Sequence, residues 1–419
     1  MKTIFAFFAA RRYWKDEDKL QAAYKEISAL AGENEHCLVT EADDPLTLPP
    51  ADCLVAVPMS GAVQKNVLAA AKKYTYAVLY GAYIRGNASP KICEEMLRCN
   101  AAPTLMDTWG VLHRGSANIM LALNETQLKN KLQVLQAATH VRRARLLKIG
   151  ETEPWVVSNA EETAMYTAQL GVEILPVPQA ELAKAYENTT REEAEPYYEL
   201  FTGHSTGCKE PTEDDLWNAA RMAAALMGLL KKYEADGCAI ACFNLLQTGT
   251  TACLGLSYIN DCTGMVAACE GDLDSAVTML LMKKLTDTRL WMANPGLHPD
   301  GSINFSHCTG PVCCLGEPLP YVLRNHHESG IGVSLQIEMP VGQTVTACRV
   351  SDNVRSMTIH KGVTVTGPYE PACRTQMHVR LDDTAHYLAT ALGCHQVFAY
   401  EDICEKLRNL AAVLGLQVL

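Results

Sequence analysis

The segment MVAACEGD, residues 265–272, decides the fold class. Its apolar residues indicate a buried strand that runs directly into Glu270, Gly271 and Asp272. Apolar residues then recur at helical spacing over residues 273–285. Glu270 and Asp272 are therefore expected where a strand ends and a helix begins, which is where open α/β sheets bind ligands. The alternative is that Asp272 only caps the helix and Glu270 is a solvated loop residue.

The chain before this segment alternates strand and helix patterns. In the first 110 residues, short apolar runs predict strands at residues 3–10, 36–40, 53–58, 76–80 and 103–107. The alternation starts again at Leu146. A long helix follows Thr212, which can cap it with Asp215, and Gly237 is expected to close it. This order is typical of parallel, doubly wound sheets in two successive α/β domains.

The composition and the hydrophobic pattern change after about Pro295. Glycine and proline become frequent there, and the alternation typical of strands dominates. Strands are expected at residues 332–339, 344–350, 356–360, 363–365 and 377–379. Closely spaced strands joined by turns favour a small antiparallel barrel or a sandwich. A final helix is expected over residues 401–414. The predicted domains are an N-terminal α/β domain, a central α/β domain and a C-terminal β-domain, at residues 1–145, 146–295 and 296–419.

Composition and charge exclude several classes of protein. Lys+Arg 36 against Asp+Glu 47 gives a net charge of −11, so neither nucleic acid nor an anionic membrane is an expected partner. No apolar run reaches the roughly 18 residues that span a bilayer. The apolar run at residues 3–10 is followed at once by two arginines, so we expect a buried strand rather than a signal peptide.

The number and spacing of the cysteines indicate the redox state of the compartment in which the protein folds. The chain has 17 cysteines at irregular spacing, which indicates a reducing cytoplasm rather than a disulfide framework. Cys308 with the Cys313–Cys314 pair is the alternative reading, a structural zinc or iron–sulfur site.

Histidine is concentrated late in the chain, where eight of the 12 histidines follow residue 297. Histidine suits transition metals and acid–base chemistry near neutral pH. Three motifs contain candidates: His307 in SHCTGP, His326 in RNHHESG and His395 in GCH. Each histidine alone is more typical of a hydrogen-bonded turn or core edge than of a ligand. In the second motif, Arg324 and Glu328 are also consistent with a surface ion pair.

Taken in order, these motifs resemble the L-fucose isomerase / L-arabinose isomerase superfamily, and most closely its shorter, fucose-isomerase-like branch. The resemblance is specific from about residue 240 to the end. The matching segments are ND at 260–261, AACEGD at 267–272, WMANP at 291–295, SHCTGP at 306–311, RNHHESGIGV at 324–333 and GCH at 393–395. The fold that this resemblance implies is α/β, with two doubly wound flavodoxin-like domains followed by an antiparallel β-barrel domain.

The resemblance also implies a metal centre. In that family a strand-end glutamate and a second acidic residue coordinate Mn²⁺, and histidines complete the site. Carried over, the ligands are Glu270, His307 and His395, with His386 the other option for the last histidine. The second acid falls 294 − 270 = 24 residues after the glutamate, at Asn294. Co²⁺, Fe²⁺ and Zn²⁺ suit the same ligands.

The implied reaction is aldose–ketose isomerisation of a pentose, a deoxyhexose or a modified sugar through an enediol. In the family two acids move the proton. Asn294 can offer an oxygen to a metal but cannot act as a base. Glu270 is then expected to carry proton transfer, with Asp272, Glu328 or a hydroxide on the metal taking over the second acid's part.

Substrate and partner expectations follow from the same resemblance. Arg324 or His326 is expected to hydrogen-bond sugar hydroxyls or an anionic group. The family's assembly implies a homo-hexamer or trimer in which N-terminal residues of a neighbour reach the site. Two alternatives stay open. One is an epimerase or lyase reaction on the same scaffold, which Asn294 favours, and the other is a non-catalytic sugar-binding relative.

Overall fold

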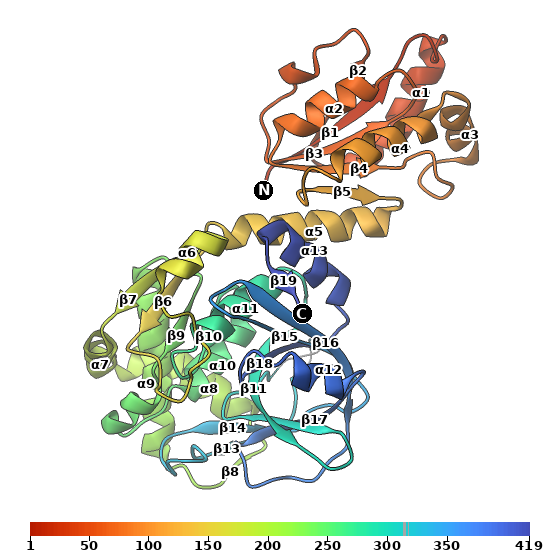
Figure 1. Cartoon of the computed structure of the whole chain (residues 1–419). Helices are drawn as coiled ribbons and strands as arrows, with labels where there is room; N and C mark the ends of the chain where they lie inside the picture. The colour runs from red at the N-terminus through yellow and green to blue at the C-terminus, as the bar shows by residue number, and fades with distance from the viewer. Residues whose placement is uncertain (313–315, 317) are drawn as a thin grey trace. The chain divides into compact units, whose positions relative to one another are not determined.

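The computed structural model describes residues 1–312, 316 and 318–419 (Figure 1). The chain forms two compact units, Met1–Thr139 and His140–Leu419. The boundary falls within helix α5 (Glu125–Val141). None of the helices in the described residues is long and apolar enough to cross a membrane. Of the suggested cysteine cluster, Cys308 is a buried free thiol, and Cys313 and Cys314 lie outside the described residues.

The first unit is built on a parallel sheet with strand order β2-β1-β3-β4-β5. Its strands are β1 (Thr3–Ala9), β2 (Glu35–Thr40), β3 (Cys53–Pro58), β4 (Tyr76–Tyr80) and β5 (Ile119–Ala122). Its other helices are α1 (Glu17–Ile27), α2 (Gln64–Lys73), α3 (Pro90–Arg98) and α4 (Ala101–Leu112), with 3₁₀ turns η1 (Ser28–Ala31) and η2 (Pro45–Thr47). β1, β3 and β4 are buried along their whole length, as strands of a sheet covered on both faces are. The predicted strand at residues 3–10 is therefore confirmed.

One predicted strand of this unit is wrong. Residues 103–107 lie inside α4, and β5 is the strand that completes the sheet. Pro103 is the third residue of the helix, in the first turn, where backbone N–H groups have no intrahelical partner and proline is tolerated. The buried residues Thr104, Leu105 and Thr108 recur at helical spacing. A five-residue apolar run is too short to reveal that period.

The second unit begins with another parallel sheet, of strand order β10-β9-β6-β7. Its strands are β6 (Arg145–Ile149), β7 (Glu173–Val177), β9 (Gly237–Ile240) and β10 (Val266–Ala268). The helices of this part are α6 (Ala164–Leu170), α7 (Gln179–Asn188), α8 (Arg191–His204), α9 (Glu213–Lys232), α10 (Cys253–Cys262) and α11 (Leu273–Lys283), with the 3₁₀ turn η3 (Phe243–Thr248). Two parallel α/β sheets are thus present, as predicted.

Helix α9 begins as predicted and ends earlier. Asp215 N donates to Thr212 Oγ1 at 3.2 Å, and Thr212 N donates to Asp215 Oδ2 at 2.8 Å, which is a capping box. The helix ends at Lys232, so the prediction that Gly237 closes it is wrong. Gly237 instead begins β9, where a Cβ would lie 2.3 Å from the carbonyl oxygen of Val266. The glycine therefore serves the close approach of β9 and β10.

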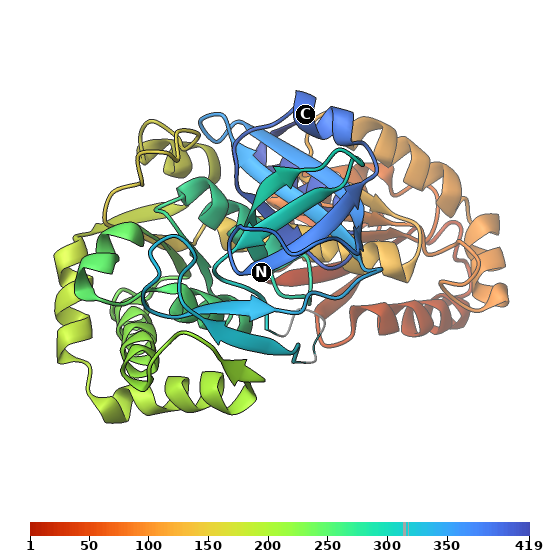
Figure 2. The ribbon, with the colours of Figure 1, turned by 90° about the horizontal axis from the view of Figure 1, so that it is seen from below.

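The second unit ends in a closed antiparallel barrel of six strands, drawn in blue and teal beside the green helices of the same unit (Figure 2). The order is β15-β18-β11-β12-β17-β16, and pairing of β15 with β16 closes the ring. The strands are β11 (Trp291–Leu297), β12 (Ile303–His307), β15 (Thr344–Ser351), β16 (Ser356–Val365), β17 (Thr375–Leu381) and β18 (Gln396–Ala399). Because the ring of strands is closed, the predicted alternative of a β-sandwich is excluded. Helices α12 (Thr384–Ala389) and α13 (Cys404–Leu414) and the short β19 (Gln417–Val418) complete the chain.

Alternate residues of the barrel strands form one apolar core. Trp291, Phe305 and Phe398 are buried there, and the rings of Phe305 and Phe398 meet edge-on with centroids 4.6 Å apart. His307 ends β12 two residues after Phe305, so it lies on the same side of that strand. The barrel core thus fixes the strand end that carries a candidate ligand.

A third, small sheet carries the RNHHESG motif. Its order is β14-β13-β8, with β8 (Gly207–Cys208), β13 (Tyr321–Arg324) and β14 (Ser334–Ile337). The strand expected at residues 332–339 is β14, which pairs with β13 rather than with a barrel strand. His326 and Glu328 lie between β13 and β14.

Candidate metal centre

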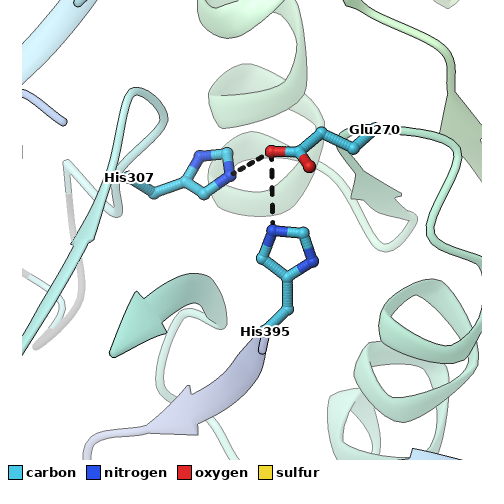
Figure 3. Close-up of side chains that lie close together, drawn as sticks. All are labelled: Glu270, His307 and His395. Carbon is cyan, nitrogen blue, oxygen red and sulfur yellow. Dashed lines mark ion pairs between the residues drawn. The ribbon is translucent and has the colours of Figure 1, made fainter. Parts of the chain in front are cut away.

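Glu270 follows β10 in a backbone conformation that most residues avoid. Glu270 and Gly271 are both left-handed, with φ of 59° and 65°, which costs a residue other than glycine roughly 1–2 kcal/mol. A Cβ on Gly271 would lie 2.8 Å from the Cα of Thr152, so the turn requires glycine there. The turn directs the carboxylate of Glu270 toward two histidines (Figure 3). Strain of this kind is typical of functional sites.

Two barrel strands bring those histidines to the carboxyl end of the parallel sheet. His307 ends β12, and His395 immediately precedes β18. Their Nε2 atoms lie 3.9 Å and 3.5 Å from Oε1 of Glu270. One ligand atom from each of the three residues lies within 4.8 Å of the other two, and all three residues are buried. The Nδ1 of His307 contacts the hydroxyl of Thr309 at 3.1 Å, which holds the ring.

The spacing of these atoms suits a divalent metal ion. Two donors that are each about 2.1 Å from one metal lie about 3.0 Å apart at an octahedral angle and about 3.4 Å apart at a tetrahedral angle. The observed separations of 3.5 Å and 3.9 Å are longer than these values, so the side chains would have to close in on a bound ion. The Nε2 of His395 is fully buried and has no hydrogen-bond partner among the described residues. Buried nitrogens without a hydrogen-bond partner are rare, and a metal ligand position would account for this one.

The three groups set one another's protonation. Burial raises the pKa of Glu270, but the close approach and charge of His395 and the charge of His307 lower it to about 2. Burial, followed by the charge of His395, lowers the pKa of His307 to about 4, so its imidazole is neutral at pH 7 and able to bind a metal. Burial lowers the pKa of His395, but the hydrogen bond to Asp272 and the proximity of Cys394 and Glu270 raise it well above its usual value. A metal ion bound at His395 would therefore displace a proton.

Asp272 caps α11 and also holds His395. Its Oδ1 accepts from the backbone N–H of Ser275 at 2.9 Å, and its Oδ2 accepts from Nδ1 of His395 at 2.8 Å. Donation from Nδ1 presents Nε2 to Glu270. Burial raises the pKa of Asp272, but the charge of Arg349 and the hydrogen bond of His395 lower it far below its usual range. The structure thus gives Asp272 an orienting position behind the site.

Two residues of the loop after β6 contact Glu270, and the sequence analysis did not single them out. Trp155 Nε1 donates to Glu270 Oε2 at 2.7 Å, and the indole meets Phe243 edge-on with ring centroids 4.8 Å apart. Glu153 is buried; its backbone N–H donates to the carbonyl of Glu270 at 3.0 Å, and its carboxylate accepts from the backbone N–H of Phe243 at 3.1 Å. Burial raises the pKa of Glu153. Their positions in the sequence could have indicated them, because these residues all follow the carboxyl ends of adjacent strands, where ligand sites form.

Arg324 is held by an acidic residue that the sequence analysis did not name. Its guanidinium donates to both carboxylate oxygens of Glu210, at 2.8 Å and 2.6 Å, and also to Gln336. The hydrogen bond from Arg324 lowers the pKa of Glu210 to about 2. Among the described residues, the ion pair of Arg324 is therefore with Glu210 and not with Glu328, which is exposed in the turn after β13.

His326 is connected to the candidate metal centre through aromatic contacts. It is buried, its Nδ1 contacts the hydroxyl of Ser329 at 3.0 Å, and its ring meets Phe243 with centroids 5.6 Å apart. Phe243 in turn contacts Trp155. These aromatic contacts connect the RNHHESG motif to the loop that holds Glu270.

The two remaining predicted ligands occupy different places. Asn294 lies in β11, opposite Ser306 in β12, so it shares the face of Ser306, which is opposite to the face of His307. His386 is exposed on α12, where its ring lies beside His360 with centroids 5.6 Å apart. His395, rather than His386, lies with Glu270 and His307.

Comparison with known proteins gives a partial match. No protein-family model matches the chain. Two curated proteins are each 28% identical over 204 residues, namely the sulfoquinovose isomerases of Priestia aryabhattai and Priestia megaterium. The aligned region covers 45% of this chain and 44% of each relative, so the chain matches less than half the length of these proteins.

Proposed function

We propose that this chain is a metal-dependent aldose–ketose isomerase acting on a pentose, a deoxyhexose or a modified sugar. The observation that carries the proposal is the buried group of Glu270, His307 and His395 at the carboxyl end of a parallel sheet. The partial similarity to two sugar isomerases supports the reaction class. Because their name specifies sulfoquinovose, a sulfonated sugar belongs among the substrates to test.

The proposed centre would supply Lewis-acid chemistry. A divalent ion held by Glu270, His307 and His395 would bind two sugar oxygens and acidify the C–H bond beside the carbonyl. We propose Mn²⁺, with Co²⁺, Fe²⁺ or Zn²⁺ as alternatives that suit the same donors. We also propose Asn294 as a further oxygen donor from its position 24 residues after Glu270. Its strand neighbours the one that carries His307, but its register partner is Ser306, so the proposal requires the side chain to turn from that face toward the metal.

The chain's own part is to move a proton between C2 and C1 of the open-chain sugar, through an enediol. Glu270 is ionised at neutral pH, because its pKa is about 2, and so can accept a proton. Trp155 fixes its Oε2 at 2.7 Å. Asp272 and Glu328 are our other proposed carboxylates for the part that Asn294 cannot perform. Asp272 is engaged by His395, whereas Glu328 is exposed.

For substrate binding we propose His326 and Arg324. His326 has the stronger support, since it is buried against Phe243, which contacts Trp155. Arg324 would bind a sugar only by sharing its guanidinium with Glu210.

The fold type of the two parallel sheets, the assembly and the cellular location are also proposals. Both parallel sheets place their first strand second, in the orders β2-β1-β3-β4-β5 and β7-β6-β9-β10, and we propose that both are flavodoxin-like. We further propose a cytoplasmic homo-hexamer or trimer whose partner is a small sugar rather than nucleic acid or a membrane.

Asn294 favours a second candidate function, a different carbon-acid reaction such as epimerisation or a lyase step. An amide cannot take the proton-transfer part of an acid. Product analysis separates the two functions. In D₂O, isomerisation moves the carbonyl between C1 and C2 and places deuterium at one of these carbons. Epimerisation leaves the carbonyl in place and labels the carbon that it inverts, and a lyase cleaves the chain.

The experiment that tests the proposal combines metal content with product analysis. Wild type and Glu270→Gln are purified in parallel, and metal is measured by ICP-MS before and after incubation with Mn²⁺. Each is then given a panel of aldoses, sulfoquinovose included, in D₂O and followed by NMR. We expect about one metal per wild-type chain and deuterium at C1 or C2, with both lost in the variant. A wild type that binds no metal but shows a sugar-induced melting shift would refute the isomerase in favour of a binding protein.

A further inference from the structure

A fully buried arginine lies behind His395, and the proposed reaction does not use it. Arg349 lies on β15, and none of its side chain is exposed. Its Nη1 donates to Asp272 Oδ2, to Ser275 Oγ and to the carbonyl oxygen of His395, each at 3.0 Å. A buried guanidinium is tolerated only when it is paired and hydrogen-bonded, so these contacts determine its position.

The other arm of the same guanidinium reaches the loop that carries Trp155. Its Nη2 donates to Ser158 Oγ at 2.7 Å and lies 3.9 Å from Asp274 Oδ2. Ser351 lies two residues further along β15, and its hydroxyl is 2.7 Å from both the carbonyl oxygen of Ser158 and Asp274 Oδ2. One barrel strand therefore contacts both the loop after β6 and the first turn of α11.

The chain just before His395 is shaped to receive the arginine. Gly393 has φ of 154°, and a Cβ there would lie 2.5 Å from Nε of Arg349 and 2.6 Å from Oγ of Ser158. No side chain fits between them. The absence of a side chain lets the backbone approach the guanidinium two residues before the proposed ligand.

We propose that Arg349 is a positioning residue that orients His395 through Asp272 and, through Ser158, places the loop of Trp155. The inference rests on the proposed function, since it assumes that His395 binds a metal. The oxygen that accepts from Nη1 of Arg349 is the same Asp272 Oδ2 that accepts from Nδ1 of His395 at 2.8 Å. A shift of that oxygen therefore rotates the imidazole.

The competing explanation is that Arg349 only neutralises buried carboxylates. Asp272 and Asp274 are both fully buried, and removing the arginine that pairs with them would leave negative charge uncompensated. A single variant such as Arg349→Met would destabilise the fold under either explanation. The double variant Arg349→Met/Asp274→Asn removes one charge of each sign and leaves the contact between Asp272 and His395 in place, so it separates the two explanations.

The test uses Co²⁺ as the probe in the full-length protein, because its visible absorption reports coordination geometry. Co²⁺ dissociation constants and spectra are measured for wild type, Arg349→Lys and the double variant, with melting temperatures alongside. Arg221→Met is the matched control. Arg221 donates to the carbonyl oxygens of Thr189 and Tyr186, so its loss removes a structural arginine elsewhere in the same unit.

We expect the double variant to melt close to wild type but to bind Co²⁺ 10- to 100-fold more weakly, with an altered spectrum, which is the usual effect of removing an outer partner of a metal ligand. Arg349→Lys, which keeps the charge, should be intermediate. Arg221→Met should lower the melting temperature and leave Co²⁺ binding unchanged. Wild-type affinity and spectrum in the double variant would overturn the positioning role and leave the proposed function standing. A wild type that binds no Co²⁺ would overturn both.

Discussion

Replacing Trp155 with phenylalanine removes one hydrogen bond to Glu270 and keeps an aromatic ring for the edge-on contact with Phe243. The bond lost is Nε1 to Oε2, at 2.7 Å. A hydrogen bond to a charged group contributes about 1.5–3 kcal/mol. Because Trp155 is 50% exposed, we take the lower end, about 1.5 kcal/mol of unfolding free energy. For a folding unit of this size, that loss lowers the melting temperature by about 3–6 °C.

The same variant should weaken metal binding. The hydrogen bond from Trp155 is one of the contacts that lower the pKa of Glu270, and it also orients the carboxylate. Outer partners of metal ligands typically contribute 10- to 100-fold to affinity. We therefore expect Trp155→Phe to bind Mn²⁺ about 10-fold more weakly or worse.

Calorimetric titration with Mn²⁺ and thermal unfolding followed by circular dichroism measure the two effects. The matched control is Phe243→Leu, which loses the edge-on ring contact, worth about 0.5–1.5 kcal/mol, but keeps the hydrogen bond. It should melt earlier and bind Mn²⁺ as wild type does. If Trp155→Phe binds Mn²⁺ with wild-type affinity, the hydrogen bond does not organise the metal centre and the reasoning is refuted.

Three further predictions concern the proposed ligands and a half-buried lysine. His307→Ala and His395→Ala should each lose bound metal by ICP-MS, and unchanged stoichiometry would remove that residue from the ligand set. Asn294→Asp should tighten Mn²⁺ in the same titration, because it adds an anionic oxygen; an unchanged constant would mean that Asn294 does not face the metal. Burial, followed by the charge of Arg289, lowers the pKa of Lys283 from 10.5 to about 8. Between those pH values the unfolded chain holds the proton more tightly than the folded chain does. The free energy of unfolding contributed by Lys283 therefore rises as the pH rises from 8 to 10.5. Lys283→Met should therefore raise the melting temperature more at pH 7.5 than at pH 10, and an equal gain at both would contradict this.

Local pattern was enough for most elements of the fold. The apolar runs at residues 53–58 and 76–80 coincide with β3 and β4, and the capping box predicted at Thr212 is present. The failures have physical causes. Residues 103–107 offered too short a run to separate strand from helix, and Gly237 was interpreted as a helix end although it serves a strand–strand contact. Barrel closure depends on the pairing of β15 with β16, which no single-strand pattern encodes.

The sequence predicted the three side chains that the structure brings together in the candidate metal centre, but not the residues around them. MVAACEGD places Glu270 at a strand end by sequence alone, and the motif order supplied His307 and His395. The contact of Trp155 with Glu270 spans 115 residues, and that of Arg349 with Asp272 spans 77. No local period relates residues so far apart, so these supporting contacts emerge only from the folded chain.

At Glu270 the left-handed backbone favours glycine for stability, whereas the proposed reaction requires a carboxylate. Glycine would adopt φ of 59° without strain, whereas glutamate costs roughly 1–2 kcal/mol there. Selection for a stable chain alone would favour a second glycine beside Gly271, and only use of the carboxylate opposes that drift. Among descendants of this protein, a lineage that abandons the reaction should therefore lose the glutamate early and become more heat-resistant as it does so. The residue found at position 270 would then indicate whether a descendant still depends on the carboxylate.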